Sequence, residues 1–320
     1  MPANRQTNGP TNHVAEQSAT GAELSGEVKN KGGDCIALQA IALPTAVAAL
    51  PVARRLSRRQ LASLKECLGE KDFQILNTIQ RYRFVSSGQI KRLYFVDSST
   101  DAANLRATNR ALKKLREHGL IAPLTRRIGG VRAGSSALIW HLTEPGERLL
   151  HLDHTERHRK RFEEPSNTFL THTLAVTEFA VQLIAMTRDT DGCEIRQLDP
   201  EPDCWRTYHS QGKTVYLKPD LYVVLKGEQY EDYYYIEIDL GTEPMTKLLK
   251  KCQIYCDHYR SGEDQRQIGI APLVAWIMPD EARKNTLMRK ITEQFHNEAN
   301  LFRVYSATEN IPRRLCDALE

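Results

Sequence analysis

The residues with the most definite chemistry in this chain of 320 residues are the basic side chains between Arg81 and Arg132. This segment holds twelve Lys or Arg against three Asp or Glu, a local charge of +9, whereas the whole chain carries only +4 and the remainder therefore −5. Positive charge that gathers on one segment attracts a polyanion. We expect the partner of this segment to be double-stranded DNA, whose phosphates Lys and Arg neutralise.

Two kinds of polar side chain follow one another along a helix that the spacing of apolar residues predicts from Thr100 to His118. Amides and a hydroxyl near its start are suited to base edges, and the later Lys and Arg are suited to phosphates. The candidate DNA-contacting residues are Asn104, Arg106, Thr108, Asn109, Arg110, Lys113 and Lys114. The alternative is an ordinary basic helix face in contact with solvent.

A glycine-rich basic loop follows this helix and carries Arg126, Arg127 and Arg132. Short strands are predicted on either side of the loop, over residues 120–124 and 137–143. Helices, then a long basic helix, then a β-hairpin with a basic tip are the order of a winged helix–turn–helix, in which a helix enters the major groove. The earlier helices are predicted over residues 57–67, 73–83 and 87–94.

Carboxylates stand on two predicted strands in the second half of the chain. Asp220 follows Pro219 within a strand predicted over 215–225, and Glu237 and Asp239 end a strand that begins at Tyr233. Because side chains alternate along a strand, Glu237 and Asp239 should face the same side. Further helices and strands follow, so the segment is expected to form a mixed α/β domain.

Composition and length bound the remaining possibilities. With 41% hydrophobic and 26% charged residues, the chain can build a packed core. No stretch is long and apolar enough to predict a membrane span, and seven scattered cysteines without a CxxC pair predict reduced thiols in the cytoplasm. The predicted divisions are a disordered tail and arm (1–55), a winged helix–turn–helix (56–155), a charged linker (156–164), an α/β domain (165–310) and a C-terminal tail (311–320).

Three stretches make the chain similar to the replication-relaxation family, DNA-binding proteins found with plasmid replication and mobilisation genes. They are HGLIAPLTRRIGGVRAGSSALIWHLTEPG (118–146), THTLAVTEF (171–179) and YIEIDLGTEP (235–244), and the similarity extends from about Phe73 to Tyr305. The resemblance implies an α/β (α+β) fold class, with a winged helix–turn–helix followed by a mixed-sheet domain similar to PD-(D/E)xK nucleases.

Nucleases of that type hold Mg²⁺ with an Asp from one strand and a Glu from the next, and a Lys two residues further on assists the attacking water. The resemblance assigns Asp220 and Glu237 to the first two positions, whereas Asp239 stands where the lysine is expected. Three carboxylates brought together repel one another, so we expect a divalent metal or a lysine to compensate them. The candidate lysines are Lys218, Lys247 and Lys250.

Two hypotheses follow. In the first, the protein binds DNA and the nuclease-like domain is catalytically silent. In the second, it is a Mg²⁺-dependent DNA endonuclease with Asp220, Glu237 and Asp239 as metal ligands and catalytic groups. Lys247 or Lys250 then replaces the missing lysine, and Glu178 is a possible further ligand. We favour the first, because a carboxylate at position 239 cannot stabilise developing phosphate charge. A third option treats the acids as plain sheet residues, and a relaxase, a replication protein or a second copy of the chain are further candidate partners.

Overall fold

Serine caps fix where two of the first helices begin. The Ser57 side chain accepts a hydrogen bond from the Gln60 backbone N–H (3.2 Å), and the Gln60 side chain accepts one from the Ser57 N–H (2.8 Å). Ser86 and Gln89 repeat this reciprocal arrangement. Such capping boxes satisfy backbone donors that a helix start leaves unpaired, so the helix boundaries follow directly from the sequence.

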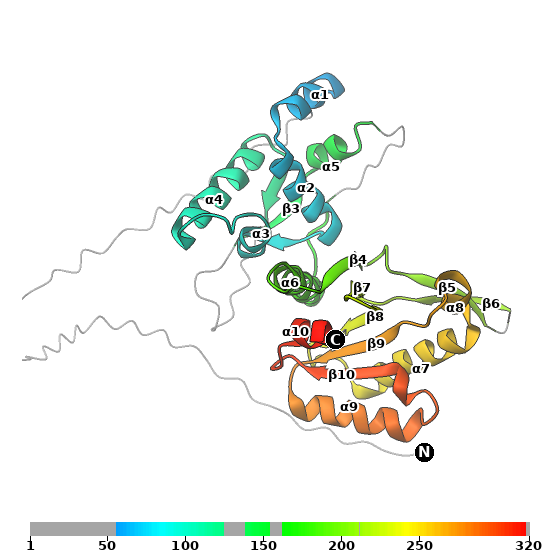
Figure 1. Cartoon of the computed structure of the whole chain (residues 1–320). Helices are drawn as coiled ribbons and strands as arrows, with labels where there is room; N and C mark the ends of the chain where they lie inside the picture. Colours follow the sequence, from blue (N-terminus) through cyan, green and yellow to red (C-terminus); the bar gives the residue numbers. More distant parts are fainter. Residues whose placement is uncertain (1–55, 125–137, 154–161, 211, 318–320) are drawn as a thin grey trace, which may run out of the picture. The chain divides into compact units, whose positions relative to one another are not determined.

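The computed structural model describes residues 56–124, 138–153, 162–210 and 212–317. These residues belong to one unit of the chain, Leu50–Glu320. Helices and short strands alternate in its first part (Figure 1), and the three strands form an antiparallel sheet in the order β1-β3-β2. The elements are α1 (Arg58–Cys67), α2 (Glu70–Tyr82), β1 (Val85–Ser86), α3 (Ser87–Tyr94), α4 (Asp101–Glu117), β2 (Ile121–Pro123), β3 (Ile139–Leu142) and α5 (Glu144–Leu150).

The second part is built around a mixed five-stranded sheet in the order β10-β9-β8-β7-β4. Strands β8, β9 and β10 pair in parallel, and β7 pairs antiparallel with both β8 and β4. A separate antiparallel hairpin is formed by β5 and β6. The elements are α6 (Asn167–Arg188), β4 (Glu194–Pro200), β5 (Arg206–Ser210), β6 (Lys213–Leu217), β7 (Leu221–Lys226), β8 (Glu231–Ile238), α7 (Met245–Ser261), α8 (Glu263–Ile268), β9 (Leu273–Met278), α9 (Glu281–Gln294), β10 (Phe302–Ser306) and α10 (Ile311–Asp317).

Both faces of this sheet are covered by helices (Figure 1). Alternate β7 residues such as Val223 pack in a core with α6 and α10, whereas Val224 packs in a second core with α7 and α9. A strand buried on both faces reads as a continuous apolar run, as Leu221–Leu225 does. The interiors of these strands are occupied by apolar side chains on both faces, so polar side chains are placed at the strand ends.

Helix α6 has the length and apolar composition of a membrane span. Residues such as Val176, Phe179 and Leu183 on this helix are buried in the same core as the sheet. That arrangement is typical of a core helix in a soluble protein. The helix also bonds to α3, because the Arg92 guanidinium donates to the Glu178 carboxylate at 2.8 Å.

Several elements differ from the sequence prediction. The strand expected over 215–225 is divided into β6 and β7, because Pro219 has no N–H to continue a ladder and lies in the break between them. Strands β4 and β5 were not predicted. Helix α10 lies in the segment that was assigned to a C-terminal tail, and its Leu315 is fully buried. The six cysteines among the described residues are free thiols.

Candidate functional site

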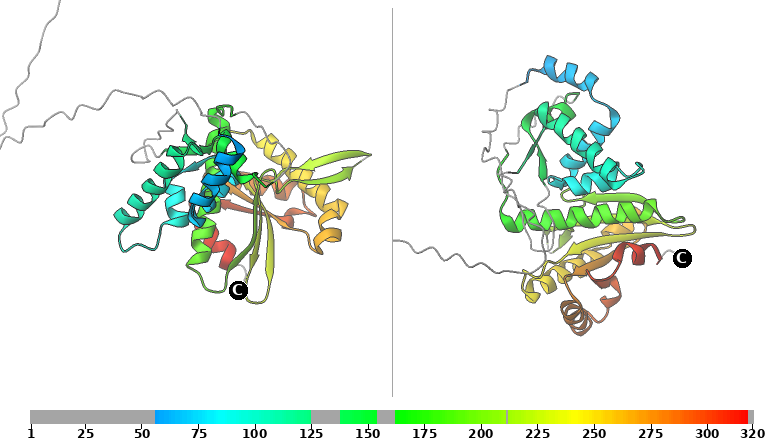
Figure 2. Two further views of the ribbon diagram at one scale, coloured as in Figure 1. Left: turned by 90° about the horizontal axis from the view of Figure 1, so that it is seen from above. Right: turned by 90° about the vertical axis from the view of Figure 1, so that its left-hand side faces the viewer.

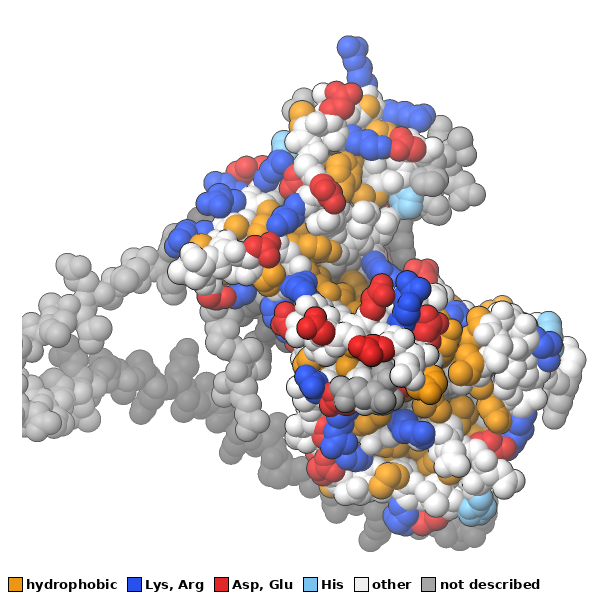
Figure 3. Space-filling model, viewed as in Figure 1, with side chains coloured by type: hydrophobic (Ala, Val, Ile, Leu, Met, Phe, Trp, Pro, Cys, Tyr) orange, Lys and Arg blue, Asp and Glu red, His pale blue; other side chains and the backbone are white. Residues whose placement is uncertain are grey.

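Helix α4 separates its polar residues onto two faces. Its N-cap is Thr100, whose side chain accepts a hydrogen bond from the Ala103 N–H, and its apolar side, with Leu112 and Leu115, is buried in the core. The opposite side is exposed, and Figure 3 shows Lys and Arg side chains gathered over α4. The exposed basic and amide residues of this face are Arg106, Asn109, Arg110, Lys113 and Arg116.

Three of the residues predicted to contact DNA lie away from that face, which corrects the prediction. Asn104 is buried, and its side-chain oxygen accepts from the Ser98 N–H at 3.1 Å. Thr108 is also buried and donates to the Asn104 carbonyl at 2.8 Å. Lys114 is half-buried and pairs with Asp72 at 2.5 Å. All three stabilise the local structure.

The spacing of the buried residues could have revealed this, because 104, 108, 112 and 115 repeat at helical intervals on one side. Arg116, in contrast, belongs to the exposed face and was missed. Arg126, Arg127 and Arg132 lie outside the described residues.

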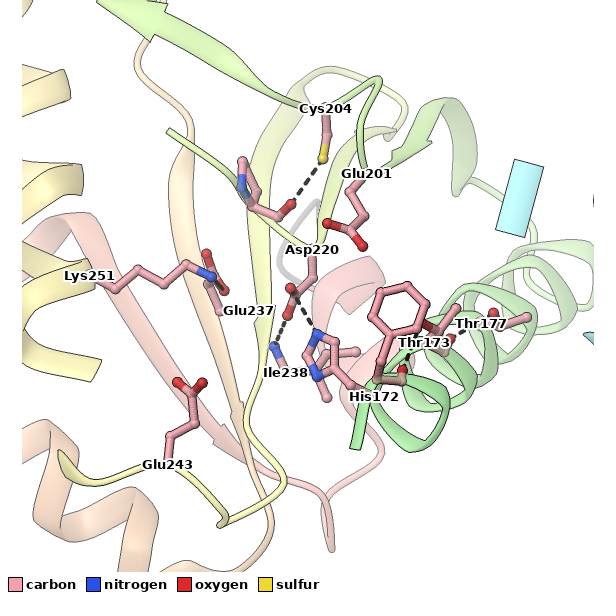
Figure 4. A network of polar contacts seen from close by, with 12 residues as sticks. His172, Thr173, Thr177, Glu201, Cys204, Asp220, Glu237, Ile238, Glu243 and Lys251 are labelled. Atoms are coloured by element: carbon pink, nitrogen blue, oxygen red, sulfur yellow. Dashed lines mark hydrogen bonds and ion pairs between the residues drawn. The ribbon is translucent and has the colours of Figure 1, made fainter. Parts of the chain in front are cut away.

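A second set of polar residues lies where β7 begins. Asp220 is 8% exposed and directly precedes β7. One carboxylate oxygen lies 3.0 Å from Nε2 of His172 on α6, and the other accepts from the Ile238 N–H on β8 at 2.7 Å (Figure 4). Asp220 therefore connects α6 with the neighbouring strand.

Glu237 on β8 is 1% exposed and faces helix α7. Its two carboxylate oxygens accept hydrogen bonds from the Lys251 ammonium and from the Tyr255 hydroxyl, both on α7. Lys251 and Tyr255 are four residues apart, so they project from one side of the helix. Figure 4 shows Lys251 extending from α7 toward Glu237, with Asp220 nearby. Five side chains and one backbone N–H thus form one polar network.

The protonation of this network follows from burial and charge. Burial raises the pKa of Glu237 to about 8, although the Lys251 charge acts to lower it. Burial also acts to raise the pKa of Asp220, but the charge of Lys251 and the hydrogen bond from His172 outweigh it and lower the pKa. The hydrogen bond to Asp220 raises the pKa of His172. Two neighbouring acids are thus driven apart in pKa, as in many functional carboxylate pairs.

The third predicted carboxylate does not join them. Asp239 ion-pairs with Arg283 on α9, whose Nη2 lies 3.2 Å from Asp239 Oδ1. Lys250 is exposed on α7, because it lies one position from Lys251 and therefore on another side of the helix. Glu178 pairs with Arg92 on α3. The compensating lysine is Lys251, which was not among the three candidates Lys218, Lys247 and Lys250.

The donor set does not fit a divalent metal in this arrangement. All four carboxyl oxygens of Asp220 and Glu237 already take part in hydrogen bonds within the protein. Among the described residues, no group of three or more His, Cys, Asp or Glu is placed to hold a metal ion. Lys251 supplies the compensating positive charge that Mg²⁺ would otherwise supply.

A small hollow opens beside Asp220. It is lined by residues of α2 and α6 together with Asp220, and among them are Arg81, Arg83 and His172. Its volume of about 20 Å³ is enough for a single water molecule. Asp220 therefore borders this hollow, whereas Glu237 is not among the residues that line it.

Two comparisons with known proteins bear on these features. Residues 76–274 match the sequence model of a protein family described as replication-relaxation. This range contains α4 as well as the network of Asp220, Glu237 and Lys251. No curated protein matches the chain.

Proposed function

Because the chain belongs to the replication-relaxation family, we propose that it acts in plasmid replication or relaxation by binding duplex DNA through a winged helix–turn–helix. The order α2, β1, α3, α4, β2, β3 resembles that of a winged helix, and α4 takes the place of its recognition helix. The proposed site of action is cytoplasmic plasmid DNA.

The exposed face of α4 carries this proposal. Arg106, Arg110, Lys113 and Arg116 would contact phosphates, and Asn109 has the amide that pairs with an adenine edge. Asn104, Thr108 and Lys114 make contacts within the protein and lie away from this face. The exposed polar residues of α4 are therefore not needed for packing, which supports their assignment to DNA contacts. Arg126, Arg127 and Arg132, which lie outside the described residues, are proposed to add phosphate contacts.

The dependence of duplex affinity on salt tests this role. A triple variant, Arg106→Ala with Arg110→Ala and Lys113→Ala, is compared with the full-length wild type by fluorescence anisotropy of a labelled duplex. Each lost phosphate contact should reduce the slope of log affinity against log salt by about 0.9. A control removes three basic residues elsewhere, Arg289, Lys290 and Arg313, and should keep the wild-type slope. Equal effects of the two triple variants would contradict a role for α4.

For the second part of the chain, we infer a catalytically silent nuclease-like domain. The order α6, β4, β7, β8, α7, β9, with Asp220 and Glu237 at adjacent strands, resembles that of PD-(D/E)xK nucleases. The internally satisfied carboxylates and the diversion of Asp239 to Arg283 support the silent form. No cleavage step is assigned to these residues.

One observation favours the second candidate function, a Mg²⁺-dependent endonuclease. Lys251 lies beside Glu237, so a lysine from α7 stands near the position that Asp239 leaves without one. Incubating full-length protein with supercoiled plasmid, with and without Mg²⁺ or Mn²⁺, separates the two candidates. Intact plasmid is expected. Nicking that needs the metal and is lost in Glu237→Gln would establish the endonuclease.

A further inference from the structure

The β5–β6 hairpin is a feature that neither part of the proposed function uses. Figure 2 (left) shows it extending beyond the five-stranded sheet. Its inner side packs on α7, where Tyr208 is buried and donates to the Ile254 carbonyl at 3.4 Å. Its outer side is free of the sheet, and the cross-strand pairs Thr207 with Tyr216 and His209 with Thr214 are exposed there.

Aromatic rings and a lysine are stacked at the base of this outer side. The Lys218 ammonium lies 4.1 Å from the centroid of the Trp205 ring and 5.6 Å from that of Tyr216. Tyr216 is 57% exposed, a large fraction for a tyrosine side chain. One face of each ring is thus associated with a cation, and much of Tyr216 is open to another planar group.

The charge of the hairpin has one sign. From Trp205 to Lys218 the sequence contains Arg206, Lys213 and Lys218 but no Asp or Glu. Alternation along the strands places Lys218 on the outer side with Tyr216, whereas Arg206 and Lys213 lie on the side of Tyr208. An exposed aromatic ring with a cation beside it is the combination found on surfaces that hold single-stranded nucleic acid, in which bases stack on the rings and the backbone follows the cations. Duplex DNA offers no free base faces to such rings.

The base of the hairpin also adjoins the acidic network. Lys218 is two residues before Asp220, and the Cys204 thiol donates to the Pro219 carbonyl between them at 3.0 Å. A strand lying on Trp205 and Tyr216 would therefore pass close to Asp220.

We propose that the outer side of the β5–β6 hairpin, formed by Trp205, Thr207, His209, Thr214, Tyr216 and Lys218, binds single-stranded DNA. The hairpin surface is separate from α4, so the proposal does not depend on duplex binding. Tyr216 stacks a base, Lys218 pairs with a phosphate and Trp205 holds the lysine in place. The surface requires no sequence preference, because every base has a π face.

The test measures binding of labelled oligo(dT) by full-length protein that carries the α4 triple variant, which removes electrostatic binding at the other surface. In this background, Tyr216→Ala is expected to weaken oligo(dT) binding at least about fivefold, the lower end of what one base–aromatic stack contributes. Lys218→Gln should weaken binding and reduce the salt slope by about 0.7, the value for single strands. The matched control is Tyr230→Ala, which removes a 65% exposed tyrosine from the turn between β7 and β8 and should leave binding unchanged.

Duplex affinity, measured in the wild-type background, is expected to be the same with and without Tyr216→Ala. Equal oligo(dT) affinity of the Tyr216 and Tyr230 variants would overturn the proposal, as would tighter binding of oligo(rU) than of oligo(dT). Loss of duplex binding alone in the α4 variant supports the proposed function without bearing on the hairpin. The two assays therefore distinguish a wrong assignment of the hairpin from a wrong assignment of α4.

Discussion

Replacing Glu237 by Gln is expected to change how the stability of the protein depends on pH. Burial raises the pKa of Glu237 from 4.5 to about 8. Between these values the folded state holds a proton that the unfolded state has released. The free energy of unfolding must therefore fall as the pH rises through this window. Gln carries no titrating group and fits the same space, so the free energy of unfolding of the variant should not fall with pH for this reason.

The size of the effect follows from the two pKa values. One pKa unit corresponds to about 1.36 kcal/mol, so the full interval from 4.5 to about 8 corresponds to roughly 5 kcal/mol. Between about pH 5.5 and 7.5, the variant should gain about 2–3 kcal/mol relative to wild type. His172, whose pKa is also raised by its bond to Asp220, adds a loss of the same sign in both proteins, so it largely cancels in the comparison.

Urea denaturation of the full chain at several pH values measures this difference, with the midpoint and slope determined separately. Glu228→Gln is the matched control, because Glu228 is exposed on the turn between β7 and β8 and should give a profile parallel to wild type. Parallel profiles for Glu237→Gln and wild type would refute the assignment of a raised pKa to Glu237. They would also remove the argument that the two acids are driven apart.

Three further outcomes follow from the structure. Lys113→Ala should reduce the slope of log duplex affinity against log salt by about 0.9. Lys114→Ala should leave this slope unchanged and lower the free energy of unfolding by about 1 kcal/mol, because Lys114 pairs with Asp72. Equal slopes for the two variants would contradict the assignment of Lys113 to the DNA-binding face of α4. Asn109→Ala should reduce discrimination between DNA sites by about 1–3 kcal/mol, which competition binding measures. Asn104→Ala should affect only stability, which denaturation measures, because Asn104 is buried and bonds to the Ser98 N–H. Lys251→Met should cost about 3–5 kcal/mol at alkaline pH, where its buried partner Glu237 ionises. A denaturation midpoint equal to that of wild type would contradict the pairing.

Local signals in the sequence predicted much of the first part of the chain. Apolar spacing predicted α1, α2 and α4 with nearly their observed limits. Helical periodicity also separates the two faces of α4. Asn104 and Thr108 were predicted to contact DNA although they lie in register with the buried Leu112 and Leu115. The sequence contained that answer, because helical periodicity depends only on the chain itself.

The sequence by itself also determined the local excess of positive charge, and it predicted that Asp220 and Glu237 lie on neighbouring strands. Their partners were decided by tertiary structure alone. His172 comes from α6, on one face of the sheet, and Lys251 comes from α7, on the other. These two residues are 79 positions apart in the sequence, and the pair of acids lies between them. Helical spacing places Lys251 beside the buried Leu248 and Tyr255 and Lys250 on another side, but it does not show that Glu237 is the partner. Which of them neutralises Glu237 depends on how α7 is rotated against the sheet, and that rotation is set by packing of its apolar side into the core.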